Sequence, residues 1–493
     1  MTEAVLGIDI GTSAVKALLA DPEGRVVGTG RAAYPTQQPV EGWSEQEPED
    51  WRRAAIAAVR ACLDSRPVDV KAVSFSGHMS APVLVDAEGR ALGACLTISD
   101  QRSDPEVDMI PSEVADAITA RTGNKPAVHL VLPRLLWWKQ HHPEIWAATR
   151  AVISPKDWLR AWMTGDVATD ATDGGNSLLF DPGSWDWSTD HAEAAGVDPA
   201  KLPRLERSDA VAGELRAEAA EAFGLPASIP VVVGVADMAA ALLGTGFDLA
   251  TDIGVSIGTS ANVIAGLPGV EPALVERFNT LPSVEPGQLY AIGSHFGGGG
   301  ALAWLSSLVT GDERPDPATL SPIAAEAATL PLGSEGLIFL PYLSGAGSPD
   351  FDPEARGAFL GLSMKHGRAH LLRAIVEGVT ADLSLSIEIL SGIAPRQRIV
   401  FSGGGSRIPF WSALMADVSG LPLVNAATAD ASTFGAALAA GVGIGWFGGD
   451  LAAARRLAAP SGPVVEPSDR TGGALLRARF STARRARRPD LFG

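Results

Sequence analysis

Residues 8–14 read IDIGTSA, and residues 255–261, in the other half of the chain, read VSIGTSA. Each copy follows an apolar run and precedes another one, VKALLAD after the first and NVIAG after the second. An apolar run, a Gly-Thr-Ser turn and a returning apolar run form the pattern of a β-hairpin with a polar turn. The repeat therefore predicts two related half-chains, each built around the same hairpin.

A second pair of segments recurs in the same order. Residues 71–80 read KAVSFSGHMS, and residues 398–407 read RIVFSGGGSR. In both, a short β-rich run ends in Ser-Gly, at 76–77 and at 402–403, where we expect a helical turn to follow. The two halves thus share an order of elements, although chance recurrence in a chain rich in Ala and Gly is the alternative.

The length and composition indicate a large globular protein. The chain has 493 residues, and single hydrophobic cores stop growing at about 250–300 residues, so we expect two large domains. With 46% apolar and 19% charged residues, it is far from the disordered class. The net charge of −18 argues against a dedicated nucleic-acid-binding protein. Cys62 and Cys95 are too few for a disulfide framework, and reduced thiols in a cytoplasmic protein are the simpler interpretation.

No targeting or membrane-spanning segment is predicted. The first residues, MTEAVLGIDIGTS, have no basic region and have the pattern of a strand. The longest weakly polar stretch, 431–449, is mostly Ala and Gly, and it predicts a buried helix and its exit turn. We therefore expect no membrane partner.

Strand-like and helix-like runs alternate between the repeated segments, which predicts an α/β fold. The continuous apolar run IPVVVGV at 229–235 predicts a buried strand that leads into Asp237 and a helix. The spacing of apolar residues predicts further helices over 51–63, 369–390 and 431–440.

The repeated turns have the composition of a phosphate-binding site. Glycine lets a phosphate approach the backbone, successive N–H groups converge on it, and hydroxyls add donors. Asp9 and Lys16 flank the first copy, where they could hold a hydrated Mg²⁺ and a phosphate, whereas Ser256 and Val263 occupy the same places in the second. This asymmetry favours a single Mg-ATP bound between unequal halves. Ordinary tight turns are the alternative.

Other sequence motifs give weaker evidence for nucleotide binding or for a catalytic nucleophile. The chain lacks G-x-x-x-x-G-K-[ST], so a P-loop protein is not expected. The run SGGGS at 402–406 could pass close to a nucleotide or form a flexible loop. Residues 254–258 fit the G-x-S-x-G elbow of hydrolases, but the second copy of the duplicated hairpin explains them better.

Asp237 is the best candidate for a general base. It follows a buried strand and begins a helix, where α/β proteins place ligands. A sugar hydroxyl is a poor nucleophile at neutral pH, and an aspartate within hydrogen-bond reach can accept its proton as the bond to phosphorus forms. Helix capping accounts for an aspartate at this position equally well.

Taken together, these segments resemble the FGGY family of carbohydrate kinases, in the actin-like ATPase superfamily, and most closely its xylulokinases. The resemblance spans roughly residues 5–445 and is specific because many stretches match in one order. Among them are IDIGTSAVKALLAD (8–21), GWSEQEPEDW (42–51), SFSGHM (74–79), SDQRS (99–103), TGN (122–124), ISPKDWLRAWMTG (153–165), VVVGVADMAAALLGTG (231–246) and SGGGSRIPFWSALMADVSGLP (402–422).

The resemblance implies an α/β fold of two ribonuclease H-like domains around an interdomain cleft that closes on ATP and sugar. We expect an N-terminal domain over residues 1–247, which holds the sugar and the catalytic aspartate. A C-terminal nucleotide-binding domain over 248–446 and a helical extension with a basic tail over 447–493 complete the expected chain.

The resemblance also assigns roles to single residues. Asp237 matches the catalytic aspartate, and Asp9, with Asp237, would hold Mg²⁺. The ATP would be bound by three loops: Gly11, Thr12 and Ser13 with Lys16; Gly258, Thr259 and Ser260; and Gly403, Gly404 and Gly405.

The segment that lies along the sugar in the family departs from the xylulokinase pattern. Xylulokinases usually show Gln-Met-His-Gly, whereas this chain has His78, Met79 and Ser80 followed by alanine. The hydrogen-bonding partners of the sugar hydroxyls have therefore changed, which affects discrimination between sugars. Asp100 and Arg102, also near the family's sugar site, are retained in type.

The function predicted is ATP-dependent phosphorylation of the primary hydroxyl of a small ketose, foremost a pentulose such as D-xylulose. Alternatives are a kinase of another ketose or polyol (ribulose, ribitol, erythritol or glycerol type) and a catalytically silent sugar or nucleotide sensor. We expect a sugar or polyol as the partner and no nucleic acid; a homodimer is left open. The arginine-rich residues 477–488 predict a terminal helix with a solvated basic face.

Overall fold

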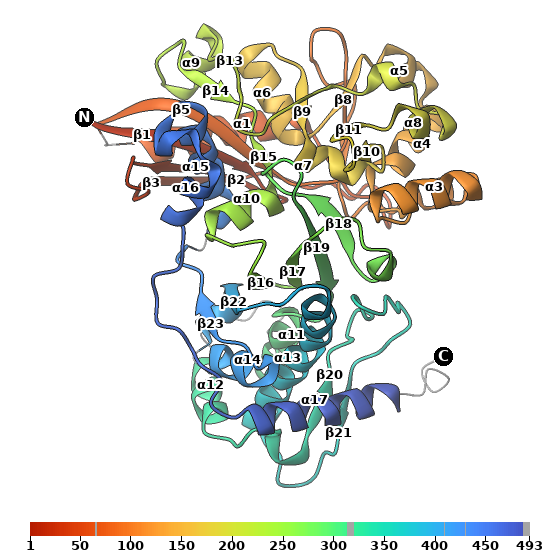
Figure 1. Cartoon of the computed structure of the whole chain (residues 1–493), viewed down its shortest axis with the longest axis vertical. Helices are drawn as coiled ribbons and strands as arrows, with labels where there is room; N and C mark the ends of the chain where they lie inside the picture. Colours follow the sequence, from red (N-terminus) through yellow and green to blue (C-terminus); the bar gives the residue numbers. More distant parts are fainter. Residues whose placement is uncertain (65–66, 313–319, 409, 429, 487–493) are drawn as a thin grey trace.

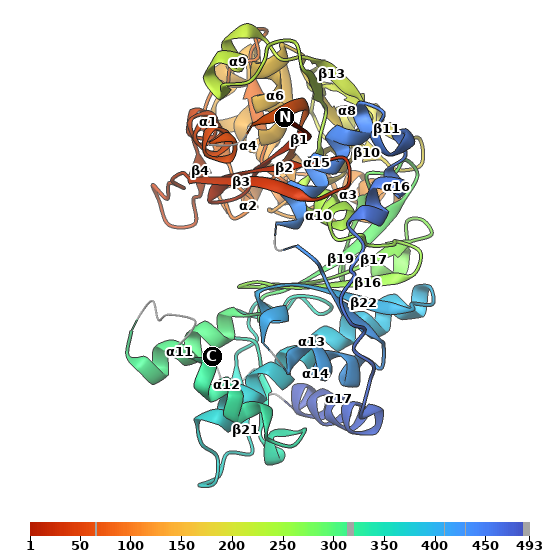
Figure 2. The ribbon, with the colours of Figure 1, turned by 90° about the vertical axis from the view of Figure 1, so that its left-hand side faces the viewer.

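Each of the two repeated hairpins forms the centre of its own β-sheet. The computed structural model of the chain describes residues 1–64, 67–312, 320–408, 410–428 and 430–486. Figures 1 and 2 show the two sheets in separate bodies, with the N-terminal strands in one and the strands that follow residue 250 in the other. The expectation of two large α/β units is therefore confirmed.

The first sheet has seven strands. The central strand β1 pairs in parallel with β5 and antiparallel with β2, which pairs in turn with β3. In spatial order the strands are β13 (Val211–Glu214), β14 (Pro230–Val232), β5 (Val68–Gly77), β1 (Thr2–Ile10), β2 (Ala14–Ala20) and β3 (Val26–Ala33), with β15 (Val235–Ala236) also on β5.

The second sheet has six strands and repeats this arrangement. Its central strand β16 pairs in parallel with β22 and antiparallel with β17, which pairs in turn with β19. In spatial order the strands are β18 (Asn279–Pro282), β19 (Leu289–His295), β17 (Ala261–Leu267), β16 (Asp252–Ile257), β22 (Arg398–Gly403) and β23 (Leu423–Asn425).

The register of the two sheets confirms the predicted duplication. In the first sheet Asp9 lies opposite Ser76, and in the second Ser256 lies opposite Ser402. The Ser-Gly pairs therefore end the strands that flank the two hairpins at matching places. The expected helical turn follows only the second pair, as a 3-10 helix over Gly404–Arg407; no helix follows Gly77 directly.

The helices predicted from apolar spacing are all present. They are α1 (Pro48–Leu63), α10 (Asp237–Gly244), α13 (Arg368–Ile393) and α15 (Ala431–Gly443). The strand expected over 229–235 is divided into β14 and β15, because Gly234 has φ of 95° and its Cα lies against the Phe75 carbonyl, where a Cβ would sit 2.7 Å from the oxygen.

Short elements complete the two bodies. The remaining helices of the first body are α2 (Asp104–Asp108), α3 (Ser112–Thr122), α4 (Val131–His141), α5 (Pro143–Ala148), α6 (Pro155–Thr164), α7 (Ala171–Gly174), α8 (Thr189–Ala194) and α9 (Ala217–Phe223). Later in the chain come α11 (Gly300–Thr310), α12 (Ser321–Ala328), α14 (Trp411–Ser419), α16 (Leu451–Leu457) and α17 (Arg470–Arg485). Paired short strands are β4 (Glu45–Gln46) with β7 (Cys95–Leu96), β6 (Val83–Val85) with β8 (Ala151–Ile153), β9 (Ala168–Asp170) with β12 (Arg204–Glu206), β10 (Phe180–Asp181) with β11 (Asp186–Trp187), and β20 (Ile338–Leu340) with β21 (Ala358–Leu360).

Both faces of the first sheet are covered. Alternate residues of β1, such as Leu6 and Ile8, pack in the cluster that contains Trp51 of α1 and Trp158 of α6. Val5, on the opposite face, packs in the cluster formed with α10 and α15. A central strand buried on both sides explains why its sequence is a nearly continuous apolar run.

Helix α15 returns from the second half of the chain to the first sheet. It packs against β1, β2, β5 and α10, and Figure 1 shows it beside the N-terminal strands. The close approach needs glycine, since a Cβ on Gly7 would meet the Thr433 carbonyl and one on Gly435 would meet the Ala240 carbonyl. The expected boundaries at 247 and 446 stay a prediction, with α15 lying on the side of the first sheet.

The terminal helix α17 packs on the second body, against α13 and α14. The expectation that its basic face is solvated is only partly right: Arg479 and Arg485 are exposed, but Arg477 bonds to the Val418 carbonyl and Arg484 pairs with Asp350. Arginines 487 and 488 lie outside the described residues.

Cys62 and Cys95 are buried and form no disulfide. Within the described ranges, no helix is both long enough and apolar enough to cross a lipid bilayer.

Candidate active site

Asp9 is the second-last residue of strand β1 and lies on the face covered by α15. The residue is 95% buried, and Oδ2 of its carboxylate accepts a hydrogen bond of 2.8 Å from the hydroxyl of Ser432. Oδ1 has no hydrogen-bond partner among the residues that the structure describes. Burial raises the pKa of Asp9, and the Ser432 hydroxyl acts in the opposite direction. A buried oxygen without a donor is available to a cation.

Lys16 lies beside Asp9, since the two residues are directly paired between β1 and β2. Its Nζ lies 2.7 Å from Oδ1 of Asp430, which immediately precedes α15. The expected phosphate ligand is therefore held by a carboxylate from the far end of the chain. Both side chains are partly exposed, so the ion pair can open toward a phosphate at low cost.

Side chains that were not predicted as site residues form hydrogen bonds with the carbonyl oxygens of the first Gly-Thr-Ser turn. Tyr34 donates its hydroxyl hydrogen to the Gly11 carbonyl, and the Gln46 amide donates to the Thr12 carbonyl at 2.8 Å. Trp51 donates to the Gln46 side chain at 3.1 Å. These bonds hold the carbonyl oxygens against the protein while the side chain of Thr12 stays exposed.

The second turn, Gly258, Thr259 and Ser260, is exposed and lies against the start of α11. The Gly299 N–H donates to the Gly258 carbonyl at 2.7 Å, and the Gly300 N–H donates to the Thr259 carbonyl at 2.8 Å. The glycine run 297–300 was not assigned from the sequence, although its composition was a usable signal. It permits the helix and the turn to approach closely.

A cleft of about 200 Å³ lies where the two halves meet. Its walls come from α10, from the ends of β16 and β22, and from the start of α15. It contains Met238, next to Asp237, together with Gly403 of the third predicted nucleotide loop and Ser432, the partner of Asp9. Gly404 is exposed and Gly405 is buried against Ile257. The structure thus brings Gly403 into one cleft with the direct neighbours of Asp9 and Asp237. The two Gly-Thr-Ser turns are not among the described residues that line this cleft, and their joint binding of ATP stays a prediction.

Asp237 is the first residue of α10, directly after β15. Its pKa is raised to about 8, first because the carboxyl is withdrawn from water and then because the charges of Asp9 and Asp173 lie nearby. A carboxyl with this pKa exchanges protons near neutrality, as a general base requires.

Asp9 and Asp237 fit a magnesium ion that is bound mainly by phosphates. No cluster of three or more His, Cys, Asp or Glu side chains able to hold a metal is found in the described part of the chain. Two nearby carboxylates, one with a free buried oxygen, suit Mg²⁺, which keeps several waters and takes one or two protein carboxylates beside the substrate phosphates.

The three residues of the expected sugar segment have different surroundings, and their contact with sugar stays a prediction. The buried His78 ring packs edge-to-face on Trp51 at 5.6 Å, and it lines neither the cleft nor the cavity at Ser80 described below. Burial lowers the pKa of His78 to about 4. Met79 packs in the cluster that contains Ala236. Ser80 lines a small cavity of the first body.

Asp100 and Arg102 bind one another. Asp100 accepts the Ser44 N–H at 2.6 Å and the Arg102 Nε–H at 3.0 Å. The Arg102 guanidinium pairs with Glu45 at 2.6 Å and stacks over Trp43 at 3.7 Å. These contacts fix the loop before α1, and a contact of either residue with sugar stays a prediction.

Asn124 joins the two bodies. Its amide donates to the Thr280 carbonyl at 2.7 Å and accepts the Thr280 N–H at 2.8 Å, so one side chain satisfies both backbone groups of a residue in β18. The neighbouring Lys125 pairs with Glu276 at 2.6 Å. The segment around Asn124 is therefore anchored to the second sheet.

A buried charge cluster beside Asp237 was not assigned from the sequence. The fully buried Lys156 of α6 lies 2.8 Å from Asp157, 2.9 Å from Asp170 and 3.1 Å from Asp173. The acidic run TDATD at 169–173 was the available signal. Three carboxylates share one lysine, and the pKa of Asp173 is raised to about 7, chiefly by burial.

The charge cluster is bonded to the segment that carries Asp237. Thr172 donates its hydroxyl hydrogen to Asp170 at 2.5 Å and accepts the N–H of Ala236 at 2.8 Å. Ala236 directly precedes Asp237, so the cluster fixes the backbone at the start of α10.

Duplicated sheets of this topology, with the carboxylates of Asp9 and Asp237 next to residues that line the cleft, are the architecture of the actin-like ATPase class. Comparison with known proteins agrees. Residues 4–244 match the N-terminal domain of the FGGY family of carbohydrate kinases, and residues 254–444 match its C-terminal domain. The chain belongs to this family, as its sequence motifs predicted. It is a sugar kinase that uses ATP with Mg²⁺.

Several known proteins are similar to this chain over most of its length. The xylulose kinase of Escherichia coli K12 is 33% identical over 421 residues, 85% of each protein. The crystal structure of xylulose kinase from Rhodospirillum rubrum is 30% identical, with a TM-score of 0.87 over 98% of both chains. The gluconokinase of Bacillus subtilis 168 is 28% identical over 431 residues, 85% of this chain and 83% of that protein.

Proposed function

We propose that this kinase transfers the γ-phosphoryl group of ATP to the primary hydroxyl of a small neutral ketose, with D-xylulose as the first candidate. The observation that carries the proposal is the pair Asp9 and Asp237, two carboxylates within electrostatic reach of each other. Their neighbours Ser432 and Met238 line the cleft. The similarity to xylulose kinases over most of the chain supports the choice of sugar.

In the proposed mechanism, Asp237 accepts the proton of the acceptor hydroxyl as the oxygen attacks phosphorus. Its raised pKa supports this role, since the base can take up the proton near neutral pH. Asp9, oriented by Ser432, and Asp237 would hold Mg²⁺, which neutralises charge on the phosphates. The backbone N–H groups of the two exposed turns would orient the triphosphate.

The acceptor could differ from D-xylulose because Ser80 stands where xylulokinases usually carry histidine. A hydroxyl reaches less far than an imidazole and forms different hydrogen bonds, so the preferred chain length or configuration can change. Ribulose, ribitol, erythritol and glycerol are the second set of candidate acceptors.

The test is sugar-dependent ADP release with Mg-ATP across D-xylulose, D-ribulose, L-ribulose, ribitol, erythritol, glycerol and D-gluconate. We expect the highest kcat/KM with a ketose, and D-xylulose first. Higher turnover with a polyol would replace the ketose assignment. Failure of every acceptor to stimulate ADP release would favour a sensor instead of an enzyme.

We also propose a cytoplasmic location, which the absence of a bilayer-spanning helix among the described residues accommodates. A homodimer remains a prediction, and sedimentation velocity with and without ATP and sugar would determine the state of association.

A further inference from the structure

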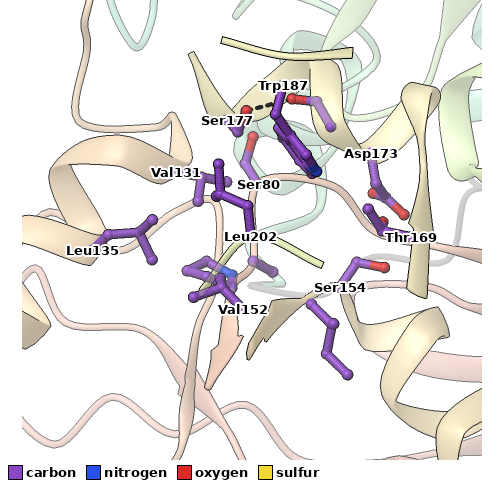
Figure 3. Close-up of a pocket in the computed structure, with 14 residues that line it drawn as sticks. Ser80, Val131, Leu135, Val152, Ser154, Thr169, Asp173, Ser177, Trp187 and Leu202 are labelled. Atoms are coloured by element: carbon purple, nitrogen blue, oxygen red, sulfur yellow. Dashed lines mark hydrogen bonds between the residues drawn. The ribbon is translucent and has the colours of Figure 1, made fainter. Parts of the chain in front are cut away.

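A small cavity lies in the first body beside the catalytic segment. It has a volume of about 50 Å³, room for about three to five water-sized groups. Figure 3 shows Ser80 and Asp173 at this cavity, with the ring of Trp187 between them in this view. The remaining wall is largely apolar, formed by residues that include Val131, Val152 and Leu202. An apolar wall with a few convergent polar groups is typical of a small-molecule site.

Most of the hydroxyls around this cavity are already used by the protein. Ser154 and Thr169 donate to Asp157 at 2.8 and 2.6 Å, and Ser177 donates to the Gly174 carbonyl. By contrast, Ser80 is 96% buried, and its hydroxyl has no hydrogen-bond partner within the described ranges. Its backbone φ of 58° is uncommon for a residue with a side chain, and such conformations concentrate at ligand sites. The free hydroxyl therefore points to a ligand.

Asp173 is the charged side chain at the same cavity. Its side chain is 7% exposed, and Oδ2 lies 3.1 Å from the fully buried Lys156 without forming a hydrogen bond of good geometry. The charge of Asp173 also acts on Asp237, which places it close to the candidate reacting centre. A carboxylate fixed by a buried lysine has lone pairs left to accept hydrogen bonds from a ligand.

The charge at the cavity is negative, and it favours neutral acceptors over acidic ones. Its described lining includes no lysine or arginine, and the charged group there is the carboxylate of Asp173. Lys156 is neutralised by three carboxylates. Hydroxyl groups of a neutral sugar can donate to Asp173, whereas the carboxylate of a sugar acid would be repelled by it.

We propose that Asp173, beside Ser80 of the expected sugar segment, binds an acceptor hydroxyl away from the phosphorylated carbon and restricts the enzyme to neutral sugars and polyols over sugar acids. This inference rests on the proposed function and adds a specificity residue to it. Asp173 binds the acceptor in this scheme, while Asp237 remains the proton acceptor.

The test measures two quantities at pH 8, where Asp173 is ionised: KM for the best neutral acceptor and Ki for D-xylonate, a sugar acid, as a competitive inhibitor. The variants are Asp173→Asn and Ser80→Ala. Asp181→Asn is the matched control, because it makes the same acid-to-amide change. Asp181 lies on β10, and it is not among the described residues that line the cavity. We expect KM to rise about tenfold in each test variant, since each loses a buried hydrogen-bonding partner.

A second measurement distinguishes a direct contact between Asp173 and the acceptor from a structural role of Asp173 in the fold. Asp173→Asn should lower the ratio of Ki for D-xylonate to KM for the neutral acceptor about tenfold, because one repelling charge is gone. Ser80→Ala and Asp181→Asn should leave this ratio unchanged. A general disturbance of the fold would weaken both ligands together and keep the ratio constant.

The outcomes distinguish this inference from the proposed function. Suppose that the wild-type enzyme phosphorylates a sugar, but both test variants keep the wild-type KM and the wild-type ratio of Ki for D-xylonate to KM. The inference is then overturned, and the proposed function stands. If the wild-type protein phosphorylates no sugar or polyol, the proposed function fails. Calorimetric titration of D-xylulose into the same variants still decides whether Asp173 and Ser80 bind this sugar. If Asp173→Asn does not fold, the KM of Ser80→Ala decides: an unchanged value overturns the subsite.

Discussion

The Ser432 hydroxyl donates a hydrogen bond of 2.8 Å to the carboxylate of Asp9, across 423 residues of sequence. The neighbouring pair, Lys16 with Asp430, spans 414 residues. The start of α15 thus holds both charged residues beside the first phosphate turn. Movement of this segment on nucleotide binding would alter both contacts together.

Replacing Ser432 by alanine should weaken magnesium use. Without the hydroxyl, Asp9 loses the donor that orients Oδ2, and the Mg²⁺ concentration for half-maximal activity should rise about three- to tenfold, which corresponds to the net contribution of one ordinary hydrogen bond. A magnesium titration at saturating sugar measures it. Ser307→Ala, which removes a hydroxyl on exposed α11, is the control; equal curves for both variants would contradict the assigned role.

Replacing Asp237 by asparagine should lower kcat by about 10²–10⁴-fold, the usual contribution of a general base. Binding of ATP, measured by calorimetry, should change little, because asparagine keeps the shape and polarity at the start of α10. Asp181→Asn should retain full turnover. Retention of more than a tenth of the wild-type kcat in Asp237→Asn would remove the residue from its assigned role.

The pH dependence of kcat/KM should follow the raised pKa of Asp237. A base must be deprotonated to accept a proton, so at limiting Mg²⁺, where Asp237 is not held by the cation, activity should increase with pH up to about 8 and fall about tenfold per pH unit below it. Saturating Mg²⁺ should move this limb to lower pH, because a bound cation favours the ionised carboxylate. The charge of Asp173 contributes to this pKa, so the acidic limb of Asp173→Asn should shift to lower pH. An unshifted limb in that variant would show that Asp173 does not act on the titrating group.

Asn124→Ala should destabilise the contact between the two bodies. The substitution leaves the N–H and the carbonyl of Thr280 without their partner, and the free energy of unfolding should fall by about 1–3 kcal/mol. Urea unfolding followed by tryptophan fluorescence measures the change. Gln288→Ala removes an exposed hydrogen bond to Glu285 and should cost less than about 0.5 kcal/mol. Similar midpoints for the two variants would argue against Asn124 as an anchor.

His78→Gln should make stability less dependent on pH. In the folded protein the pKa of His78 is lowered to about 4, whereas an unfolded histidine has a pKa of about 6.5. Below pH 6.5 the unfolded state takes up the proton first, so the wild type loses stability as pH falls from 6.5 toward 4, by about 2 kcal/mol at pH 5. The variant lacks this component. Denaturation at pH 7.5 and pH 5.0 compares them, and identical pH effects would refute the assignment.

Local patterns in the sequence predicted much of this protein. The two hairpins, the α/β class, the helices and the positions of Asp9 and Asp237 at element ends all follow from turn chemistry and apolar spacing between near neighbours. The family motifs added the domain type and the ATP-dependent kinase activity. Such features are visible in one sequence because strand and helix periods, and the glycine in a tight turn, depend on contiguous residues.

The directions of the side chains and their partners from distant parts of the chain could be known only from the tertiary structure. No local pattern shows that α15 returns to the first sheet to hold Asp9 and Lys16, that His78 turns toward Trp51 while Ser80 faces the cavity, or that Lys156 gathers three aspartates beside Asp237. Close packing of distant segments selects these contacts, since a buried polar group is stable only where another part of the chain supplies its partner.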